Sequence, residues 1–406
     1  MIKAGRKYLR VIFSGRMVVV SLMGFSSGLP LLLTGSVLQA WMQQEGVDLG
    51  TIGLFALVGL PYTLKFLWAP FLDRYSLGGM GRRRGWLLRV QIGLILALVG
   101  LSLTEPAINP MGVAAAALLV TFFSATQDIV IDAHRRESLA DHELGLGSSL
   151  YVNGYRVGLL LASSGGLILA DYMPFSQVYQ LLALAMLIGV FTTLLAPEPS
   201  IAADAPKTFY EAVIAPFLEY FCRPNAFLIL LFILLYKIGD IMASHMSIPF
   251  YLDLGYSKTE IGAIVKGFGF WATVFGGLAG GIVMLRLGIY RALWTFGLLQ
   301  SISTAGFAVL GAYGYSLPGL AAVIAFENLS GGMGTAAYVA FMSSLTNKKF
   351  TATQYALLSS LMGIPRVIVA APTGFLAASF GWVAFFSCCA LIAVPGLLLL
   401  RRFRSW

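Results

Sequence analysis

The sequence predicts an all-α polytopic membrane protein with twelve transmembrane helices, arranged as two six-helix halves related by pseudo-symmetry. Three observations predict this class. Of the 406 residues, 58% are hydrophobic and 11% are charged, whereas soluble domains carry about 25% charged residues. The apolar residues form runs of about 20, the length that a helix needs to cross a bilayer. The basic residues gather on alternate connections between these runs.

Twelve segments are long and apolar enough to span a membrane. The first follows a basic N-terminus, as in a secretory signal peptide, but it is too long and has no small-residue cleavage site. We therefore expect an uncleaved helix there. Glycine and proline are frequent inside the segments, as membrane helices tolerate. The segments cover residues 17–42, 49–71, 86–104, 111–132, 146–170, 178–196, 226–251, 259–285, 292–313, 317–345, 353–376 and 382–400.

The basic residues predict that both termini lie in the cytoplasm. They cluster before the first segment, after the second, on alternate later connections and in the C-terminal tail, whereas Lys258 alone lies on the other side. Lys and Arg are enriched in cytoplasmic loops. The net charge of +9 is therefore a signal of orientation. We expect membrane lipids, and no nucleic acid, as partners.

A polar segment divides the chain into two halves of similar length. Residues 1–196 form the N-terminal six-helix half, residues 197–224 the expected cytoplasmic linker, and residues 225–406 the C-terminal six-helix half. Weak internal similarity indicates a duplication, and this organisation is typical of the twelve-helix major facilitator fold. The matching motifs are Gly46-x5-Ile52-Gly53 with Gly255-x5-Ile261-Gly262, and Arg156-Val157 with Arg366-Val367.

Ionisable side chains inside the predicted spans are candidate functional residues, because a charge in the membrane is costly. They fall in seven spans and leave the third, sixth, ninth and twelfth without an interior charge, which predicts one central polar cavity. Cations outnumber acids, so the cavity suits an anionic substrate. The residues are Lys65, Asp128, Arg156, Lys237, Asp240, Lys266, Glu327 and Arg366.

Each of these residues has an expected role. Asp128 is the predicted proton-coupling acid, with Asp240 and Glu327 as alternatives, since burial and a nearby cation shift a carboxyl pKa in opposite directions. Two structural alternatives stay open, because Lys237 can pair with Asp240 within one helix and Asp128 can pair with Arg156. The side chains expected to bind substrate are the cations Lys65, Arg156, Lys237, Lys266 and Arg366, with Gln39, Gln127, Tyr151, Asn153 and Trp271 adding amide bonds and stacking faces.

A motif of one acid and several arginines follows the second span. Asp73-Arg74 is followed by Gly81-Arg82-Arg83-Arg84, and this arrangement resembles the loop signature of the facilitator superfamily, in which such residues latch the two halves. The resemblance implies a gating role for Asp73, Arg74, Arg82 and Arg83. The alternative is a plain basic anchor on the cytoplasmic side.

Five runs of residues resemble the AmpG muropeptide permease family, strongly in the first half and weakly but colinearly in the second. This resemblance implies a bacterial inner-membrane importer of N-acetylglucosamine-1,6-anhydro-N-acetylmuramic acid, with or without peptide, driven by the proton gradient. It implies a monomer with the proton as coupling ion and no other cofactor or metal. The runs are Gly24-Phe-Ser-Ser-Gly-Leu-Pro30, Leu38-Gln-Ala-Trp41, Lys65-Phe-Leu-Trp-Ala-Pro-Phe-Leu-Asp73-Arg74, Gly81-Arg-Arg-Arg-Gly-Trp86 and Ala125-Thr-Gln-Asp-Ile-Val-Ile-Asp-Ala133.

Other functions stay open from the sequence. A transporter of another anionic metabolite, such as an acyl-coenzyme A or a sugar acid, or a facilitator without proton coupling, would carry the same cavity. A membrane-embedded enzyme would need catalytic acids or metal ligands at the interface, and three histidines with a short linker argue against one. A sensor would need a signalling domain. We therefore expect a transporter and not an enzyme.

Overall fold

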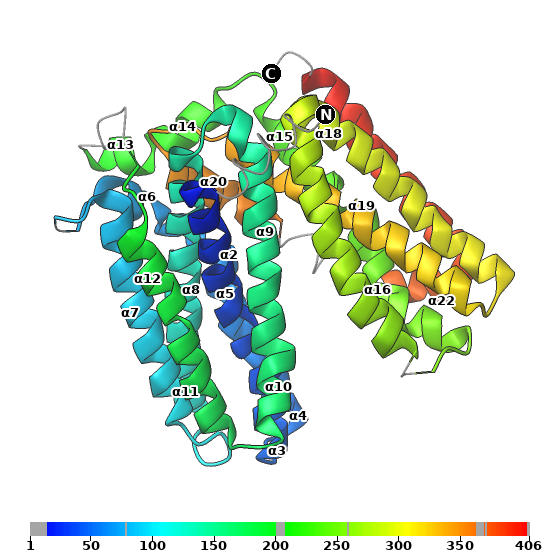
Figure 1. Ribbon diagram of the computed structural model, residues 1–406, viewed down its shortest axis with the longest axis horizontal. Helices are drawn as coiled ribbons and strands as arrows, with labels where there is room; N and C mark the ends of the chain where they lie inside the picture. Colours follow the sequence, from blue (N-terminus) through cyan, green and yellow to red (C-terminus); the bar gives the residue numbers. More distant parts are fainter. Residues whose placement is uncertain are drawn as a thin grey trace. The chain divides into compact units, whose positions relative to one another are not determined.

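The computed structural model describes residues 14–77, 79–199, 208–257, 260–362, 369 and 372–403. Over these ranges the chain is helical and contains no strand (Figure 1). It divides into two compact units. Unit 1 comprises Met1–Asp141, Leu150–Leu218 and Leu345–Ser360, and unit 2 comprises His142–Ser149, Glu219–Ser344 and Leu361–Trp406.

Unit 1 is a bundle of long helices with one interrupted member. The second predicted span is a series of short pieces, because Pro61 and Pro70 lack a backbone donor and begin new helices. The longer helices are α2 (Gly15–Leu33), α3 (Ser36–Gln44), α7 (Arg82–Ser102), α8 (Pro110–Ser138), α9 (Leu144–Leu160), α11 (Phe175–Ala185) and α12 (Leu187–Leu195), of which α9 has its first turns in unit 2. The short ones are α4 (Leu49–Leu54), η1 (Phe55–Gly59), α5 (Leu60–Leu64), η2 (Lys65–Leu67), α6 (Ala69–Arg74), η3 (Asp141–Glu143), η4 (Leu161–Gly165), α10 (Gly166–Ala170), α13 (Phe209–Val213) and α14 (Ala215–Phe221).

One helix of unit 1 comes from the C-terminal half of the sequence. This is α20 (Thr351–Leu361), which lies at the same end of the unit as α6, α13 and α14 (Figure 1). The Gln354 amide donates to the backbone oxygen of Pro216 at 3.1 Å and so joins α20 to α14. The compact units therefore exchange short segments relative to the sequence halves, and the boundaries at residues 196 and 225 stay a prediction about the repeat.

Unit 2 contains two helices that turn sharply at a glycine. Gly288 inside α18 and Gly381 inside α22 have φ angles of 73° and 74°, a conformation that favours glycine. Each of these helices therefore joins residues of two consecutive predicted spans. The helices of unit 2 are α15 (Ala226–Leu235), α16 (Ile238–Asp253), η5 (Ile261–Phe268), α18 (Gly269–Tyr313), α19 (Leu317–Ser344), α22 (Thr373–Leu399) and η6 (Leu400–Phe403).

The helix that begins with η5 has a reciprocal cap at its start. The backbone N–H of Ser257 donates to the Glu260 carboxylate at 2.7 Å, and the backbone N–H of Glu260 donates to the Ser257 hydroxyl at 3.2 Å. The Tyr315 hydroxyl donates to the same carboxylate at 2.7 Å. The hydrogen bonds from Tyr315 and Ser257 hold the pKa of Glu260 below its usual range.

Seven helical stretches of the described residues are long and apolar enough to cross a membrane. Helical residues also cover the described part of each of the twelve predicted segments. The protein is therefore a multi-pass membrane protein. The count of twelve stays a prediction, because several segments are assembled from short helices and part of the eleventh lies outside the described residues.

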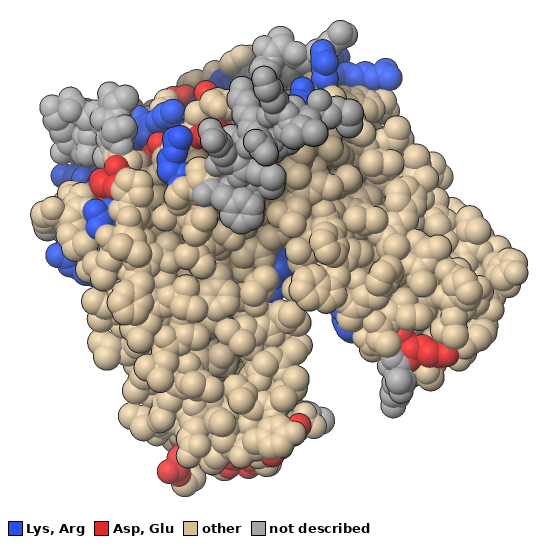
Figure 2. All heavy atoms as spheres, viewed as in Figure 1, with Lys and Arg blue, Asp and Glu red and all other residues tan. Residues whose placement is uncertain are grey.

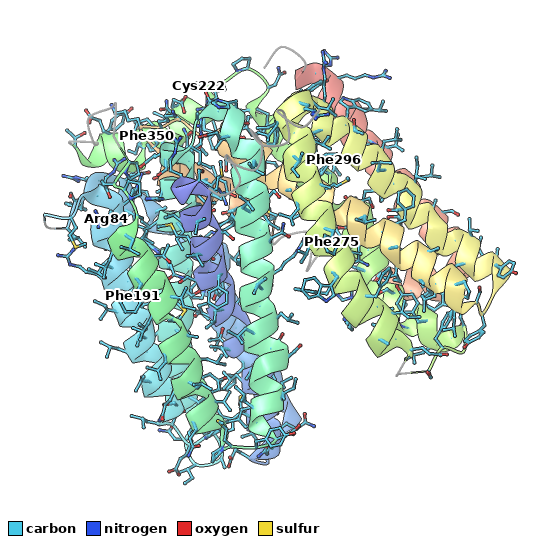
Figure 3. All side chains as sticks on the ribbon, in the orientation of Figure 1. Arg84, Phe191, Cys222, Phe275, Phe296 and Phe350 are labelled. Atoms are coloured by element: carbon cyan, nitrogen blue, oxygen red, sulfur yellow. The ribbon has the colours of Figure 1, made fainter. Side chains whose placement is uncertain are left out.

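The surfaces of both units fit a lipid environment. Phe191 on α12 and Phe275 on α18, both labelled in Figure 3, are 61% and 60% exposed. Figure 2 shows charged side chains mostly at the ends of each unit, with long uncharged sides between them. Apolar surface of this extent is unfavourable in water. The sides are therefore the parts that contact the membrane.

Candidate functional site

A buried acid in unit 1 connects three helices. Asp128 on α8 is 8% exposed and accepts a hydrogen bond from the Ser27 hydroxyl on α2. The Ser27 and Tyr151 hydroxyl oxygens are 3.0 Å apart, so the contact continues to α9. Lys65, on η2, is also buried and acts electrostatically on Asp128 and on Asp132. Three predicted site residues, Asp128, Lys65 and Tyr151, thus lie together.

Two predicted amide residues on α8 and α9 differ in their contacts. Gln127 accepts from the Ser26 hydroxyl at 3.2 Å and donates to the Ser26 backbone oxygen at 3.0 Å, so it joins α8 to α2. Asn153 on α9 is buried, and neither polar atom of its side chain has a hydrogen-bond partner among the described residues. A buried amide of this kind requires a partner. Asn153 is therefore the amide of unit 1 best placed to receive a ligand.

A second polar cluster lies in unit 2. The Lys237 ammonium is 3.3 Å from an Asp240 carboxylate oxygen and donates to the Gln300 side-chain oxygen at 3.0 Å. The predicted pair within one helix is therefore present. A cavity of about 100 Å³ adjoins it, lined by Ile233, Lys237, Asp240, Ile241, Thr335, Tyr338 and Met362.

The same cluster includes Glu327 on α19. Its carboxylate accepts from the Ser303 hydroxyl at 2.5 Å, and the Ser303 and Ser330 oxygens are 2.8 Å apart. Asp240 and Lys237 both act electrostatically on Glu327. Unit 2 therefore brings Glu327, from the tenth predicted segment, to the Lys237–Asp240 pair of the seventh.

The motif after the second span forms a buried ion-pair network, which we call the latch: Asp73, Arg82, Arg83 and Glu137. Arg83 is fully buried, and its guanidinium is 2.7 Å from Asp73 and 2.5 Å from Glu137. Arg82 lies 3.2 Å from Glu137 and donates to the Asp73 backbone oxygen at 2.9 Å. The predicted gating residues Asp73, Arg82 and Arg83 therefore meet.

Asp73 also caps the start of α20. Its carboxylate accepts from the backbone N–H of Thr353 at 2.9 Å and from the Thr353 hydroxyl at 2.8 Å. An acid at a helix N-terminus satisfies free N–H groups and favours the helix dipole. The latch therefore holds a segment of the C-terminal half of the chain within unit 1.

Comparisons with known proteins identify the family of this chain. The Major Facilitator Superfamily model matches residues 20–370. The anhydromuropeptide permease of Escherichia coli (strain K12) is 44% identical over 396 residues, which cover 97% of this chain and 81% of that protein. The putative transporter AmpG 1 of Rickettsia bellii (strain RML369-C) is 33% identical over 402 residues, covering 95% and 98%.

This chain belongs to the AmpG family of the major facilitator superfamily. Solved structures agree on the fold. The E. coli fucose:proton symporter has a TM-score of 0.76 at 13% identity, over 96% of this chain and 98% of that one. A proton:xylose symporter has a TM-score of 0.69 at 12% identity, over 96% and 95%. The predicted fold class and family are confirmed, and the chain is a permease-family member rather than an enzyme.

The remaining predicted residues of this AmpG-family chain are Gln39, Arg74, Arg156, Lys266, Trp271 and Arg366. Arg74 has its guanidinium 5.1 Å from the Tyr75 ring and makes a separate contact. Arg156 is half-buried on α9. Gln39, Lys266 and Trp271 are exposed within their units. Arg366 lies outside the described residues, and the substrate roles of all these residues stay predictions.

Sequence reasoning missed several partners of the charged groups. Glu137 and Glu198 complete the arginine network, since Glu198 accepts from the backbone N–H groups of Arg83 and Arg84 at 2.8 and 2.9 Å. Figure 3 labels Arg84 at this end of α7. Thr353 lies 280 positions from Asp73 in the chain. The signal for Glu137 and Glu198 in the sequence was weak, because both are acids next to the ends of predicted spans, where acidic residues are ordinary.

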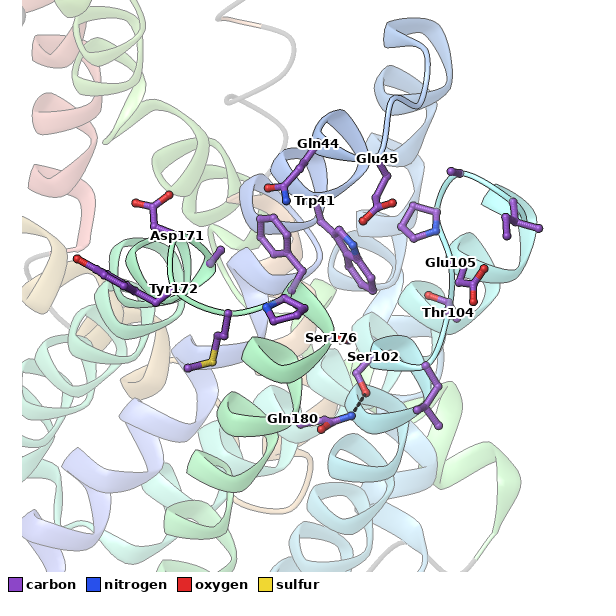
Figure 4. A pocket seen from close by; sticks show the side chains of 18 residues that line it. Trp41, Gln44, Glu45, Ser102, Thr104, Glu105, Asp171, Tyr172, Ser176 and Gln180 are labelled. Carbon is purple, nitrogen blue, oxygen red and sulfur yellow. Dashed lines mark hydrogen bonds between the residues drawn. The ribbon is translucent and has the colours of Figure 1, made fainter.

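A larger cavity of about 810 Å³ lies at another end of unit 1 (Figure 4). Its walls come from the end of α3, the α7–α8 connection and the α10–α11 connection, and they include Glu45, Glu105 and Asp171. The Gln180 amide donates to the Ser102 hydroxyl at 3.4 Å on one side. None of the predicted site residues lines this cavity. The volume of a cavity therefore does not identify the place of the predicted site residues.

Proposed function

We propose that this chain carries anhydro-muropeptides, meaning N-acetylglucosamine-1,6-anhydro-N-acetylmuramic acid with or without peptide, across the bacterial inner membrane into the cytoplasm. The observation that carries the proposal is 44% identity over 97% of the chain to a protein named anhydromuropeptide permease. Both termini face the cytoplasm, and the protein acts as a monomer. Transport proceeds by rocking of two helix bundles about a site near the middle of the membrane.

The cations of the predicted spans support an anionic substrate. The muramyl lactate and the peptide carboxylates are negative, and Lys65, Arg156, Lys237 and Lys266 supply cations inside or beside the membrane-spanning helices. Asn153 offers an unused buried amide for the sugar or the peptide backbone. A charge inside a membrane helix is costly, so its presence there indicates a function.

Coupling to protons is assigned to Asp128. This carboxyl group lies among helices, next to the Lys65 cation and the Ser27 hydroxyl, so its proton affinity depends on its hydration and on its neighbours. Asp240 and Glu327 in unit 2 are the alternative carriers, since both are carboxyl groups inside predicted spans and the two act electrostatically on each other. No other cofactor takes part.

Uptake into liposomes tests the proposal. The purified protein is reconstituted, and uptake of radiolabelled N-acetylglucosamine-1,6-anhydro-N-acetylmuramic acid is counted with and without an imposed pH gradient. We expect saturable uptake without a gradient and accumulation at least several-fold above equilibrium with the lumen alkaline. Liposomes without protein are the control. Equilibration without accumulation would reject proton coupling, and uptake of acyl-coenzyme A or a sugar acid in its place would reject the substrate.

A further inference from the structure

Arg135 lies between the buried acid and α20. It is 1% exposed, and its guanidinium carbon is 4.2 Å from the centre of the Tyr151 ring and 5.5 Å from that of Tyr355. One guanidinium nitrogen donates to the Tyr355 hydroxyl at 3.1 Å, and the same nitrogen is 3.0 Å from Asp132. A buried arginine therefore joins α8, α9 and α20 within unit 1.

Two routes connect this arginine to Asp128. The first is a chain of contacts, in which Tyr151 meets both the guanidinium of Arg135 and the hydroxyl of Ser27, and Ser27 donates to Asp128. The second is electrostatic, because Lys65 acts on both Asp128 and Asp132, and Asp132 is the acid beside Arg135. The titratable groups that face Asp128 are Lys65, Asp132, Tyr62 and Tyr151.

The charge balance among these groups depends on whether Asp128 is ionised or protonated. With Asp128 ionised, Lys65 has two acids to neutralise, and Asp132 remains available to Arg135. With Asp128 protonated, Lys65 is left with Asp132 alone and competes with Arg135 for it. Protonated Asp128 can also donate to Ser27, which reverses the direction of the hydrogen bond that leads to Tyr151. Both changes loosen the environment that holds Arg135 against Tyr355.

We propose that Asp132 and Arg135 are positioning residues that couple the charge state of Asp128 to the contact between α20 and unit 1. This inference rests on the proposed coupling role of Asp128. The segment concerned is the one that rocking requires to move, since α20 belongs to the C-terminal half of the sequence but is held by Asp73 and Arg135 of the N-terminal half. Protonation of Asp128 then favours release of α20, and deprotonation favours its return.

A thiol probe on α20 measures this coupling directly. Ala356 is 1% exposed, and cysteine adds a single sulfur atom to its side chain, so Ala356→Cys is placed in a background in which Cys222, Cys388 and Cys389 are replaced by serine. The rate of maleimide labelling in liposomes, corrected for the intrinsic pH dependence of the thiol with a denatured sample, reports the release of α20. We expect the corrected rate to rise at least threefold as the pH is lowered through the titration of Asp128.

We call the coupling from Asp128 through Asp132 and Arg135 to Tyr355 the relay. Four variants separate the relay from a structural effect. Asp128→Asn should give the high rate at every pH. Asp132→Asn and Tyr355→Phe should remove the pH dependence although Asp128 is intact. Trp68→Phe removes a 3.0 Å hydrogen bond to Thr126 on the same helix α8, outside the relay, and should keep the dependence of the parent protein. Folding is checked by size-exclusion profile before each measurement.

Uptake and exchange in the same liposomes distinguish a failure of the proposed coupling role of Asp128 from a failure of the relay. If Asp128→Asn still accumulates substrate under a pH gradient, the proposed coupling role of Asp128 is wrong. If Asp128→Asn loses accumulation but keeps substrate exchange, the coupling role stands. In that case an unchanged pH profile of labelling in both Asp132→Asn and Tyr355→Phe overturns the relay, and its loss in both supports the relay.

Discussion

Arg83 is a charged side chain buried with a partner for each of its guanidinium nitrogens. Arg83 is fully buried, and its guanidinium donates to the Leu72 backbone oxygen at 3.0 Å, to Asp73 at 2.7 Å and to Glu137 at 2.9 and 2.5 Å. The planar fork of arginine fits two carboxylates at once, which lysine cannot reproduce. The latch therefore depends on arginine at this position and not on positive charge alone.

The same property of arginine gives a prediction for substrate binding. If Arg156 holds a substrate carboxylate through two parallel hydrogen bonds, Arg156→Lys keeps the charge but loses the fork. We expect the KM for the anhydro-muropeptide to rise about tenfold, the equivalent of roughly 1.4 kcal/mol. Uptake kinetics and direct binding, each normalised to folded protein, provide the measurement.

A purely structural role of Arg156 would give a different result. An arginine that only holds helices together would show normal affinity in Arg156→Lys and a lower yield of folded protein in Arg156→Ala. Arg89→Lys is the matched control, because Arg89 is exposed and donates to the backbone oxygens of Leu77 and Gly85. It should change neither KM nor yield.

The sequence was informative about charges and poorly informative about their neutral partners. Asp128, Lys237 and Glu327 are conspicuous because each interrupts an apolar run. Ser27, Gln300 and Ser303, which bind them, belong to types that are ordinary in membrane helices, so no pattern distinguishes them. Long-range pairing such as Arg135 with Tyr355, 220 positions apart, follows only from the folded arrangement.

At the scale of elements, glycines set how closely two helices approach. A Cβ atom at Gly24 or Gly28 of α2 would overlap backbone oxygens of α9, and one at Gly154 or Gly158 of α9 would overlap backbone atoms of α2. Each helix thus has two glycines four residues apart on the shared face, the spacing that lets membrane helices pack backbone to backbone. This close packing brings Ser27 against Asp128 and Tyr151.

The packing of α2 on α9 predicts a strong effect of one methyl group. Gly28→Ala should push the helices apart and lower stability by about 1–3 kcal/mol, the usual cost of overpacking. Gly100→Ala in α7 is the matched control, because a Cβ there has nothing within 4 Å, and alanine favours a helix. Thermal unfolding in detergent gives both values. Equal Tm values for the two variants would contradict the close approach.

Element boundaries were predicted less well than the existence of elements. Residues 49–71 were expected as one span, and the structure has five short helices there, because prolines and glycines interrupt the hydrogen-bonding pattern. Hydrophobicity reports the path through the membrane but not the regularity of the helix along it. The π-helical turns at η4 and η5 likewise have no signature in composition.

At the scale of the whole molecule, charge is segregated along each unit. In unit 1 the latch arginines lie at one end, and Glu45, Glu105 and Asp171 line the cavity at another (Figures 2 and 4). In unit 2 Glu260 lies beside Tyr315, at the end opposite the turn at Gly288. The alternation of basic connections predicted this segregation. It could not predict which segments the two units exchange, because that depends on tertiary contacts such as those of Asp73.

The orientation of each unit in the membrane gives the last prediction. The helical stretch from Gly288 to Tyr313 is roughly 37 Å long at about 1.5 Å per residue, more than the hydrocarbon thickness of about 30 Å. Cysteines replacing Leu287 and Tyr313 therefore lie on opposite sides of the membrane. In unit 1, Asp141 and Tyr172 form the corresponding pair, and Tyr172 and Tyr313 are 83% and 80% exposed.

An impermeant maleimide added to intact spheroplasts should label Tyr172→Cys and Tyr313→Cys, in a protein whose three native cysteines are replaced by serine. Asp141→Cys and Leu287→Cys should react only after the membrane is opened, because we expect the basic ends of both units in the cytoplasm. Labelling of the opposite members would invert the topology. Labelling of both members of one pair in intact cells would show that the segment between them does not cross the membrane as assigned. Because each pair lies within one unit, this result would also show which unit is wrongly assigned.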